Sequence, residues 1–145
     1  MKVGPLGSAS GGKQQASMVY MQTVLFVGAG GAIGAMGRFM LGRVIFQAMG
    51  PGYPWGTLAA NIIGALALGI LAELFALRLS APHNVQAALT AGVLGGFTTF
   101  SAFSLETALM IERNEWMGAA SYTAISVIAC VGALFLGMAI VRNIV

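Results

Sequence analysis

Gly92 to Glu106, with the sequence GVLGGFTTFSAFSLE, is the stretch that decides the fold. Gly95 and Gly96 weaken a helix, because glycine costs about 1 kcal/mol relative to alanine in a helix interior. Four hydroxyl side chains that follow can hydrogen-bond freed backbone groups or a ligand: Thr98, Thr99, Ser101 and Ser104. Irregular backbone at membrane depth is tolerated only where it is buried in protein or lines a water-filled cavity. We therefore predict a membrane helix that is broken here and held by other helices.

The rest of the chain is strongly apolar. Of its 145 residues, 58% are hydrophobic and 8% are charged, whereas a soluble domain carries about 25% charged residues. Four stretches are long enough to cross a bilayer, which takes about 20 residues of helix: about 23–47, 55–77, 85–111 and 116–141. The sequence predicts an all-α integral membrane domain over residues 21–145, with four transmembrane helices of which the third is broken near its middle. Residues 1–20, rich in Gly, Ser and Gln, are predicted to form a disordered N-terminal tail.

Composition excludes several classes of function. One histidine, His83, and one cysteine, Cys130, are too few for a metal-ligand cluster or an intrachain disulfide. The chain has no aspartate, so no hydrolytic triad can be assembled, and we expect no enzyme activity. The net charge is +3, but the basic residues are scattered, which argues against a nucleic-acid partner.

The first span carries both small and charged residues. Gly30, Gly34 and Gly37 share one face, and small residues at this spacing let membrane helices approach closely. Arg38 lies well inside the span, where an arginine is costly unless it snorkels or meets water or a partner; one interpretation is a role in a wet vestibule. Arg43 lies near the end of the span and is expected to snorkel to the interface.

Two polar residues stand out in the second span. Asn61 has an amide that is costly to bury without a hydrogen bond, so it either joins two helices or contacts a ligand. Glu73 is nearer the end of the span, and we expect it to be interfacial or paired with Arg78.

A polar stripe runs along the last span. Tyr122, Ser126 and Cys130 are spaced at i, i+4 and i+8 and therefore share one helix face. Such a stripe more often packs helices than lines a pathway. It bears on function only if it faces the break in the third span.

The arginines give little information on orientation. With four spans, Arg78 and Arg142 lie on one side of the membrane, while Arg43 and Arg113 lie on the other. The positive-inside rule is then decided by the tail alone, chiefly by Lys13. A chain with so little bias could insert both ways, so that two opposite copies could pair.

Three stretches, in this order and spacing, resemble the Fluc (CrcB-type) family of bacterial fluoride ion channels: GGAIGAMGR at 30–38, WGTLAANIIG at 55–64 and GGFTTFSAFSLE at 95–106. The resemblance covers all four spans. It implies an antiparallel, dual-topology homodimer in the lipid bilayer of the bacterial cytoplasmic (inner) membrane, with two narrow pores. The implied function is passive export of fluoride, which lowers its cytoplasmic concentration.

The resemblance also implies roles for individual residues. Phe100 and Phe103 look like pore phenylalanines, and Asn61 looks like an amide that meets the ion. Gly95 and Thr98 look like residues whose backbone carbonyls hold a structural sodium ion at the dimer axis. The remaining expected pore residues carry hydroxyl groups: Thr99, Ser101, Tyr122 and Ser126.

The physical chemistry of fluoride suits these residue types. Fluoride is small and strongly hydrated, so a pore must replace its water with hydroxyl and amide donors. Phenylalanine rings can add positive edges without binding the anion too tightly to leave. The break also ends one half-helix in exposed carbonyls, which suit a cation, and begins another with a partial positive charge, which suits an anion. Cys130 departs from the family pattern, since we expect a hydroxyl one turn after Ser126 and a thiol is a weaker donor.

The main alternative is a small four-helix, dual-topology, proton-coupled multidrug transporter. It would need a membrane-embedded carboxylate in the first span, which carries only Arg38 and Arg43. Glu73 and Glu106 in later spans remain as candidates. A second alternative is a non-catalytic assembly subunit, which has no need of a hydroxyl-rich break.

Overall fold

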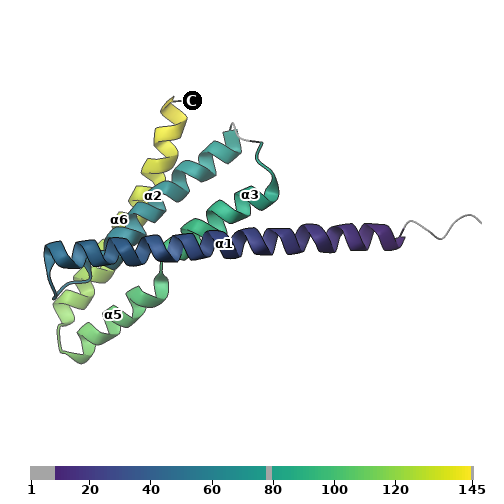
Figure 1. The fold of residues 1–145 in the computed structure, drawn as a ribbon. Helices are drawn as coiled ribbons and strands as arrows, with labels where there is room; N and C mark the ends of the chain where they lie inside the picture. The colour runs from purple at the N-terminus through teal and green to yellow at the C-terminus, as the bar shows by residue number, and fades with distance from the viewer. Residues whose placement is uncertain (1–8, 78–79, 145) are drawn as a thin grey trace, which may run out of the picture.

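The computed structural model describes residues 9–77 and 80–144, and within these ranges all regular secondary structure is helical (Figure 1). The elements in chain order are α1 (Ala9–Met49), α2 (Trp55–Leu77), α3 (His83–Ala87), the π-helical η1 (Ala88–Leu94), α4 (Gly95–Phe97), α5 (Phe100–Glu112) and α6 (Trp116–Ile144).

Four helical stretches of the described residues are long and apolar enough to cross a membrane: Lys13–Met49, Trp55–Leu77, His83–Glu112 and Trp116–Ile144. The third stretch is built from α3, η1, α4 and α5, and its chain direction changes between α4 and α5 (Figure 1). The predicted all-helical membrane fold, with a third span that is broken near its middle, is confirmed.

Helix α1 differs from the sequence analysis at its N-terminus. We predicted disorder for residues 1–20, but α1 already begins at Ala9 and covers residues 9–20 of that tail; residues 1–8 lie outside the described residues. From Lys13 to Val27 no glycine or proline interrupts the chain, so the helix of the span continues backward without a stop signal. With 41 residues, α1 is about 60 Å long at 1.5 Å per residue, about twice the thickness of a bilayer core.

Glycines let the helices touch backbone to backbone. A Cβ added at Gly34 of α1 would collide with the carbonyl oxygen of Val93 in η1. Between α2 and α6, a Cβ at Gly69 would collide with the carbonyl oxygen of Leu134, and one at Gly137 with that of Leu66. The small-residue face predicted for the first span therefore packs against the third span, as expected for membrane helices.

The break itself lies at two threonines and not at the glycines. Thr98 and Thr99 have extended backbone conformations, with φ/ψ of −86°/159° and −154°/121°, whereas Gly95 is helical at −63°/−36°. Gly96 instead allows close packing, because a Cβ there would lie 2.5 Å from the carbonyl oxygen of Gly31 in α1. The glycines thus bring the third span against α1, and the helix stops only after Phe97.

Candidate functional site

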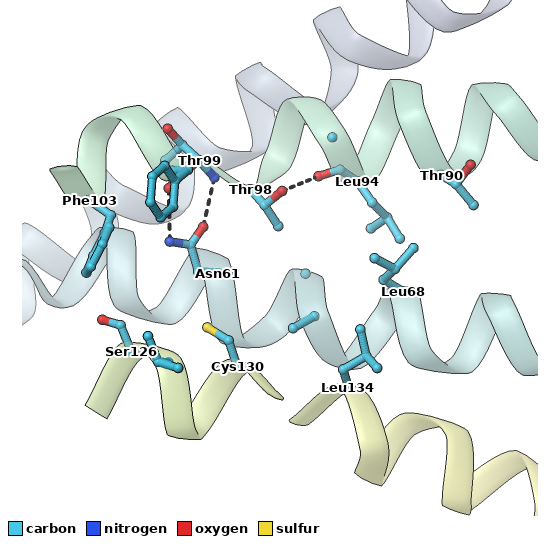
Figure 2. A pocket seen from close by; sticks show the side chains of 15 residues that line it. Asn61, Leu68, Thr90, Leu94, Thr98, Thr99, Phe103, Ser126, Cys130 and Leu134 are labelled. Atoms are coloured by element: carbon cyan, nitrogen blue, oxygen red, sulfur yellow. Dashed lines mark hydrogen bonds between the residues drawn. The ribbon is translucent and has the colours of Figure 1, made fainter. Parts of the chain in front are cut away.

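The backbone of the break is held by one side chain from α2. Asn61 Nδ2 donates a hydrogen bond to the carbonyl oxygen of Thr99 at 3.1 Å, and Thr99 N–H donates to Asn61 Oδ1 at 2.8 Å (Figure 2). The amide of Asn61 therefore satisfies the N–H that Thr99 no longer donates within a helix, and it adds a bond to the Thr99 carbonyl, which as the N-cap carbonyl also belongs to the first turn of α5. An amide nitrogen has two N–H donors, so one donor of Asn61 remains for a ligand after this role in joining two helices.

Local capping completes the turn. Thr98 Oγ1 donates to the carbonyl oxygen of Leu94 at 2.9 Å, so the Thr98 side chain folds back onto the end of η1. Thr99 is the N-cap of α5, and its Oγ1 accepts a hydrogen bond from Ala102 N–H at 3.1 Å. A threonine at this position is a preferred N-cap, so the new helix starts with one of its free N–H groups satisfied.

The break leaves carbonyl groups at the end of the first half-helix without their helical partners. In a continuous helix the carbonyl of Gly95 would accept from Thr99 N–H, and that of Thr98 from Ala102 N–H. The first N–H donates to Asn61 and the second to the side chain of Thr99. Gly95 and Thr98, predicted to hold sodium, are thus two of the four residues from 95 to 98 whose carbonyls lack the helical N–H partner, and the carbonyl of Gly96 accepts from Arg38 instead. Neutral oxygen ligands of this kind fit a hard cation.

A pocket of about 380 Å³ opens beside the break, between α2, the third span and α6 (Figure 2). Most of the predicted site residues line it: Asn61, Gly95, Thr98, Thr99, Phe100, Phe103 and Ser126. The Phe100 and Phe103 rings are in contact, with centroids 5.4 Å apart and an interplanar angle of 41°. Phe103 is partly buried against the helix core, whereas Phe100 is 78% exposed.

The α6 stripe divides between two environments. Ser126 lines the pocket, its hydroxyl oxygen is buried, and it has no hydrogen-bond partner among the described residues. Cys130, one turn further along α6, lines the same pocket. A buried hydroxyl without a partner is uncommon in proteins and calls for a water or ligand. This part of the stripe faces the break, which was the condition for its having a functional meaning.

Tyr122, by contrast, is not among the pocket-lining residues. It is fully buried, and its hydroxyl donates to Glu106 Oε2 at 2.7 Å. Glu106 Oε1 accepts a second hydrogen bond from Thr57 Oγ1 at 2.6 Å. The Tyr122 ring contacts that of Phe103, with centroids 5.3 Å apart. Tyr122 therefore supports the wall of the pocket and ties α6 to α5, while Glu106 has both oxygens engaged.

Sequence reasoning missed Thr57. It lies inside the WGTLAANIIG stretch and one turn before Asn61, so the two share a face of α2. This spacing could have pointed to Thr57 from the sequence. Its role becomes clear only from its hydrogen bond to Glu106, which lies on another helix.

Two further predicted residues lie away from the main pocket. The hydroxyl of Ser101 is exposed and within 3.1 Å of Thr99 Oγ1. Arg38 Nε donates to the carbonyl oxygen of Gly96 at 3.2 Å, so its positive charge lies at the carbonyl-bearing end of the first half-helix, where a cation is favourable. Arg38 lines a separate pocket of about 400 Å³.

Glu73 is paired, but not with the expected partner. Arg142 of α6 makes two hydrogen bonds to its carboxylate, from Nε to Oε1 at 2.8 Å and from the terminal nitrogen to Oε2 at 3.0 Å. The predicted partner, Arg78, lies outside the described residues. Glu73 and Glu106, the two carboxylates left as candidates for proton coupling, are thus both engaged in hydrogen bonds to other spans.

The architecture is that of a small four-span membrane protein whose polar groups gather at a break in one span. Residues 25–138 match the family model described as CrcB-like protein, Camphor Resistance (CrcB), and the chain belongs to this family. It is 48% identical over 121 residues to a protein of Nitrobacter winogradskyi named fluoride-specific ion channel FluC, covering 83% of this chain and 96% of that protein. A Phenylobacterium zucineum protein of the same name is 49% identical over 125 residues, covering 86% and 98%.

These findings confirm the family resemblance. Together with the four spans, they make the chain a multi-pass protein of the bacterial inner membrane, as the sequence predicted.

Proposed function

We propose that this protein is a fluoride-selective channel that lets fluoride leave the cytoplasm passively, and that it is not an enzyme. The observation that carries the proposal is the pocket at the break, where an unpartnered hydroxyl of Ser126, the spare amide donor of Asn61 and two phenylalanine rings converge. The printed names of the relatives, fluoride-specific ion channel, support the same substrate.

The donors suit an anion that must lose its water. Ser126 and Asn61 can each give a hydrogen bond, and the edges of Phe100 and Phe103 carry partial positive charge. None of these four groups bears a formal charge, so an ion is held weakly enough to move on. Arg38 of α1 donates to the carbonyl of Gly96 beside the break and can raise the local concentration of anions, as charged clefts do.

A second, antiparallel copy would complete the pore. The Phe100 ring is 78% exposed in one chain, so a pathway lined by it needs another surface to enclose it. The balance of arginines across the loops supports both orientations. Labelling a cysteine placed in the loop before Trp116, in a Cys130→Ser background, should then succeed from each side of the membrane. Labelling from one side only would exclude the antiparallel dimer.

Sodium would have a structural role at the axis of this dimer. The free carbonyls of Gly95 and Thr98 are the ligands we propose for it, two from each chain. Exchanging sodium for a bulky organic cation should lower the stability of the purified dimer. A dimer that is indifferent to the exchange would count against this site.

The decisive experiment is ion flux through liposomes that contain only this protein. With a potassium ionophore to set the voltage, a fluoride electrode should record rapid fluoride efflux, and a chloride electrode should record almost no chloride efflux. The rate should not depend on a proton gradient. Comparable chloride and fluoride rates would overturn the proposal, and a strict requirement for a proton gradient would favour a coupled transporter.

A further inference from the structure

The separate pocket of about 400 Å³ lies where α1 crosses the start of α2. Its six lining residues are Arg38, Phe39, Gly42, Arg43, Gly56 and Thr57. The two helices touch there through glycines, since a Cβ at Gly56 would lie 3.1 Å from the Cα of Gly42. With no side chains at the crossing point, the space beside it is left to the two arginines.

Within the part of the chain that the structure describes, neither arginine of this pocket forms an ion pair, and the carboxylate of Glu106 reaches the lining only through its hydrogen bond from Thr57. The salt bridges among the described residues join Arg113 to Glu115 and Arg142 to Glu73, so neither Arg38 nor Arg43 has a carboxylate partner there. A guanidinium has five N–H donors, and the one that Arg38 uses, Nε, goes to a backbone carbonyl. Arginines with donors to spare at one pocket can bind an anion with several oxygens.

The surroundings of the pocket are apolar and face outward. Phe39 is 69% exposed and Met40 is 67% exposed, on the same stretch of α1 as Arg43. Trp55, which begins α2 next to Gly56, is a residue type typical of the membrane interface. An exposed arginine near the end of a span, beside an interface-type tryptophan and an exposed apolar surface, matches a molecule with a charged head and a hydrocarbon tail.

We propose that the Arg38–Arg43 pocket binds the phosphate group of an anionic phospholipid. Arg43, which is exposed, makes the main contact with the phosphate, and the acyl chains lie along Phe39 and Met40. The planar guanidinium matches phosphate oxygens two at a time, and the anionic surface of the membrane supplies the ligand. A free phosphate ion would share the charge contact but would leave the apolar surface uncovered.

Native mass spectrometry of the purified full chain, incubated with equal amounts of phosphatidylglycerol and phosphatidylcholine, tests this directly. The parent protein should retain phosphatidylglycerol in preference. Arg43→Gln should weaken that retention about tenfold, because it removes a charge-assisted hydrogen bond. Arg113→Gln is the matched control, since Arg113 is an exposed arginine with a salt-bridge partner outside the pocket, and it should bind as the parent does.

Three results would overturn the proposal. Equal losses in the two variants would show that the lipid responds only to surface charge. Complete displacement of phosphatidylglycerol by excess inorganic phosphate would mean that the site takes a soluble anion. A second experiment needs no variant and so does not depend on whether Arg43→Gln folds. A photoactivatable phosphatidylglycerol added to the unmutated protein should label the α1 peptide around Arg43. Labelling spread evenly over the four spans would also refute the site. Binding is read without any flux, so the outcome is independent of the proposed channel function.

Discussion

Asn61→Ala tests whether the amide holds the break or only contacts the ion. The substitution removes both hydrogen bonds to Thr99, at 3.1 and 2.8 Å. Hydrogen bonds between membrane helices contribute about 0.6–1.7 kcal/mol each, so the loss should be about 1–3 kcal/mol of unfolding free energy. Fluoride flux should fall as well, because the break loses its fixed shape.

Asn61→Asp separates the effect on stability from the effect on fluoride flux. Aspartate keeps an oxygen that accepts from Thr99 N–H but loses the donor to the carbonyl oxygen of Thr99. It also places two oxygens against each other and a carboxylate beside the anion pathway. We expect an intermediate loss of stability with a complete loss of flux. Asn61→Ser, which keeps a short donor, should retain more flux than Asn61→Asp.

The assay is thermal unfolding in detergent, followed by the loss of the folded peak in size-exclusion chromatography, together with liposome flux on the same samples. Asn143→Ala is the control, because its exposed amide bonds only a carbonyl of its own helix and a surface change should stay within about 0.5 kcal/mol. If Asn61→Ala unfolds at the same temperature as the parent, the amide does not hold the break and the argument for the freed carbonyls fails.

Three further outcomes are expected. Phe100→Ile and Phe103→Ile should fold normally, since apolar swaps of similar volume are mild, but should lose most fluoride flux because isoleucine has no ring edge; unchanged flux in both would reduce the phenylalanines to packing. Gly34→Ala should prevent α1 from packing on the third span and lower the yield of folded protein, whereas Gly28→Ala, which meets nothing within 4 Å, should purify like the parent. Arg142→Gln should lower the unfolding temperature, because it leaves a buried carboxylate on α2 without its partner; an unchanged temperature would show that the ion pair adds no stability.

The fold was accessible from sequence because its signals are local. Hydrophobic length defines each span, and the spacing of Gly30 and Gly34 marks the face that packs on η1. A broken third span also followed from one short stretch. The helical period predicted that Ser126 and Cys130 share a face of the last span, whereas the grouping of Ser126 with Phe103 in one pocket was implied only by the family resemblance.

The finer geometry depends on partners that no local pattern specifies. The break falls at Thr98 and Thr99 because an amide 38 residues earlier in the chain captures the Thr99 backbone. Tyr122 turns away from the pocket because a glutamate on α5 accepts its hydroxyl. Glu73 pairs with an arginine 69 residues away. Each of these contacts joins two spans, so neither partner alone predicts it.

The contact between Asn61 and Thr99 also constrains how the protein is made. Unpaired backbone groups in lipid cost several kcal/mol each, so the third span cannot enter the bilayer alone in its bent form. During synthesis α2 emerges first. The third span must then either insert straight and bend against α2 afterwards, or insert together with α2 as a helical hairpin. In both cases a ribosome-bound fragment that ends before Thr99 has an α2 whose amide still lacks its partner, and the pocket is complete only when α6, which forms its remaining wall, has also been synthesised.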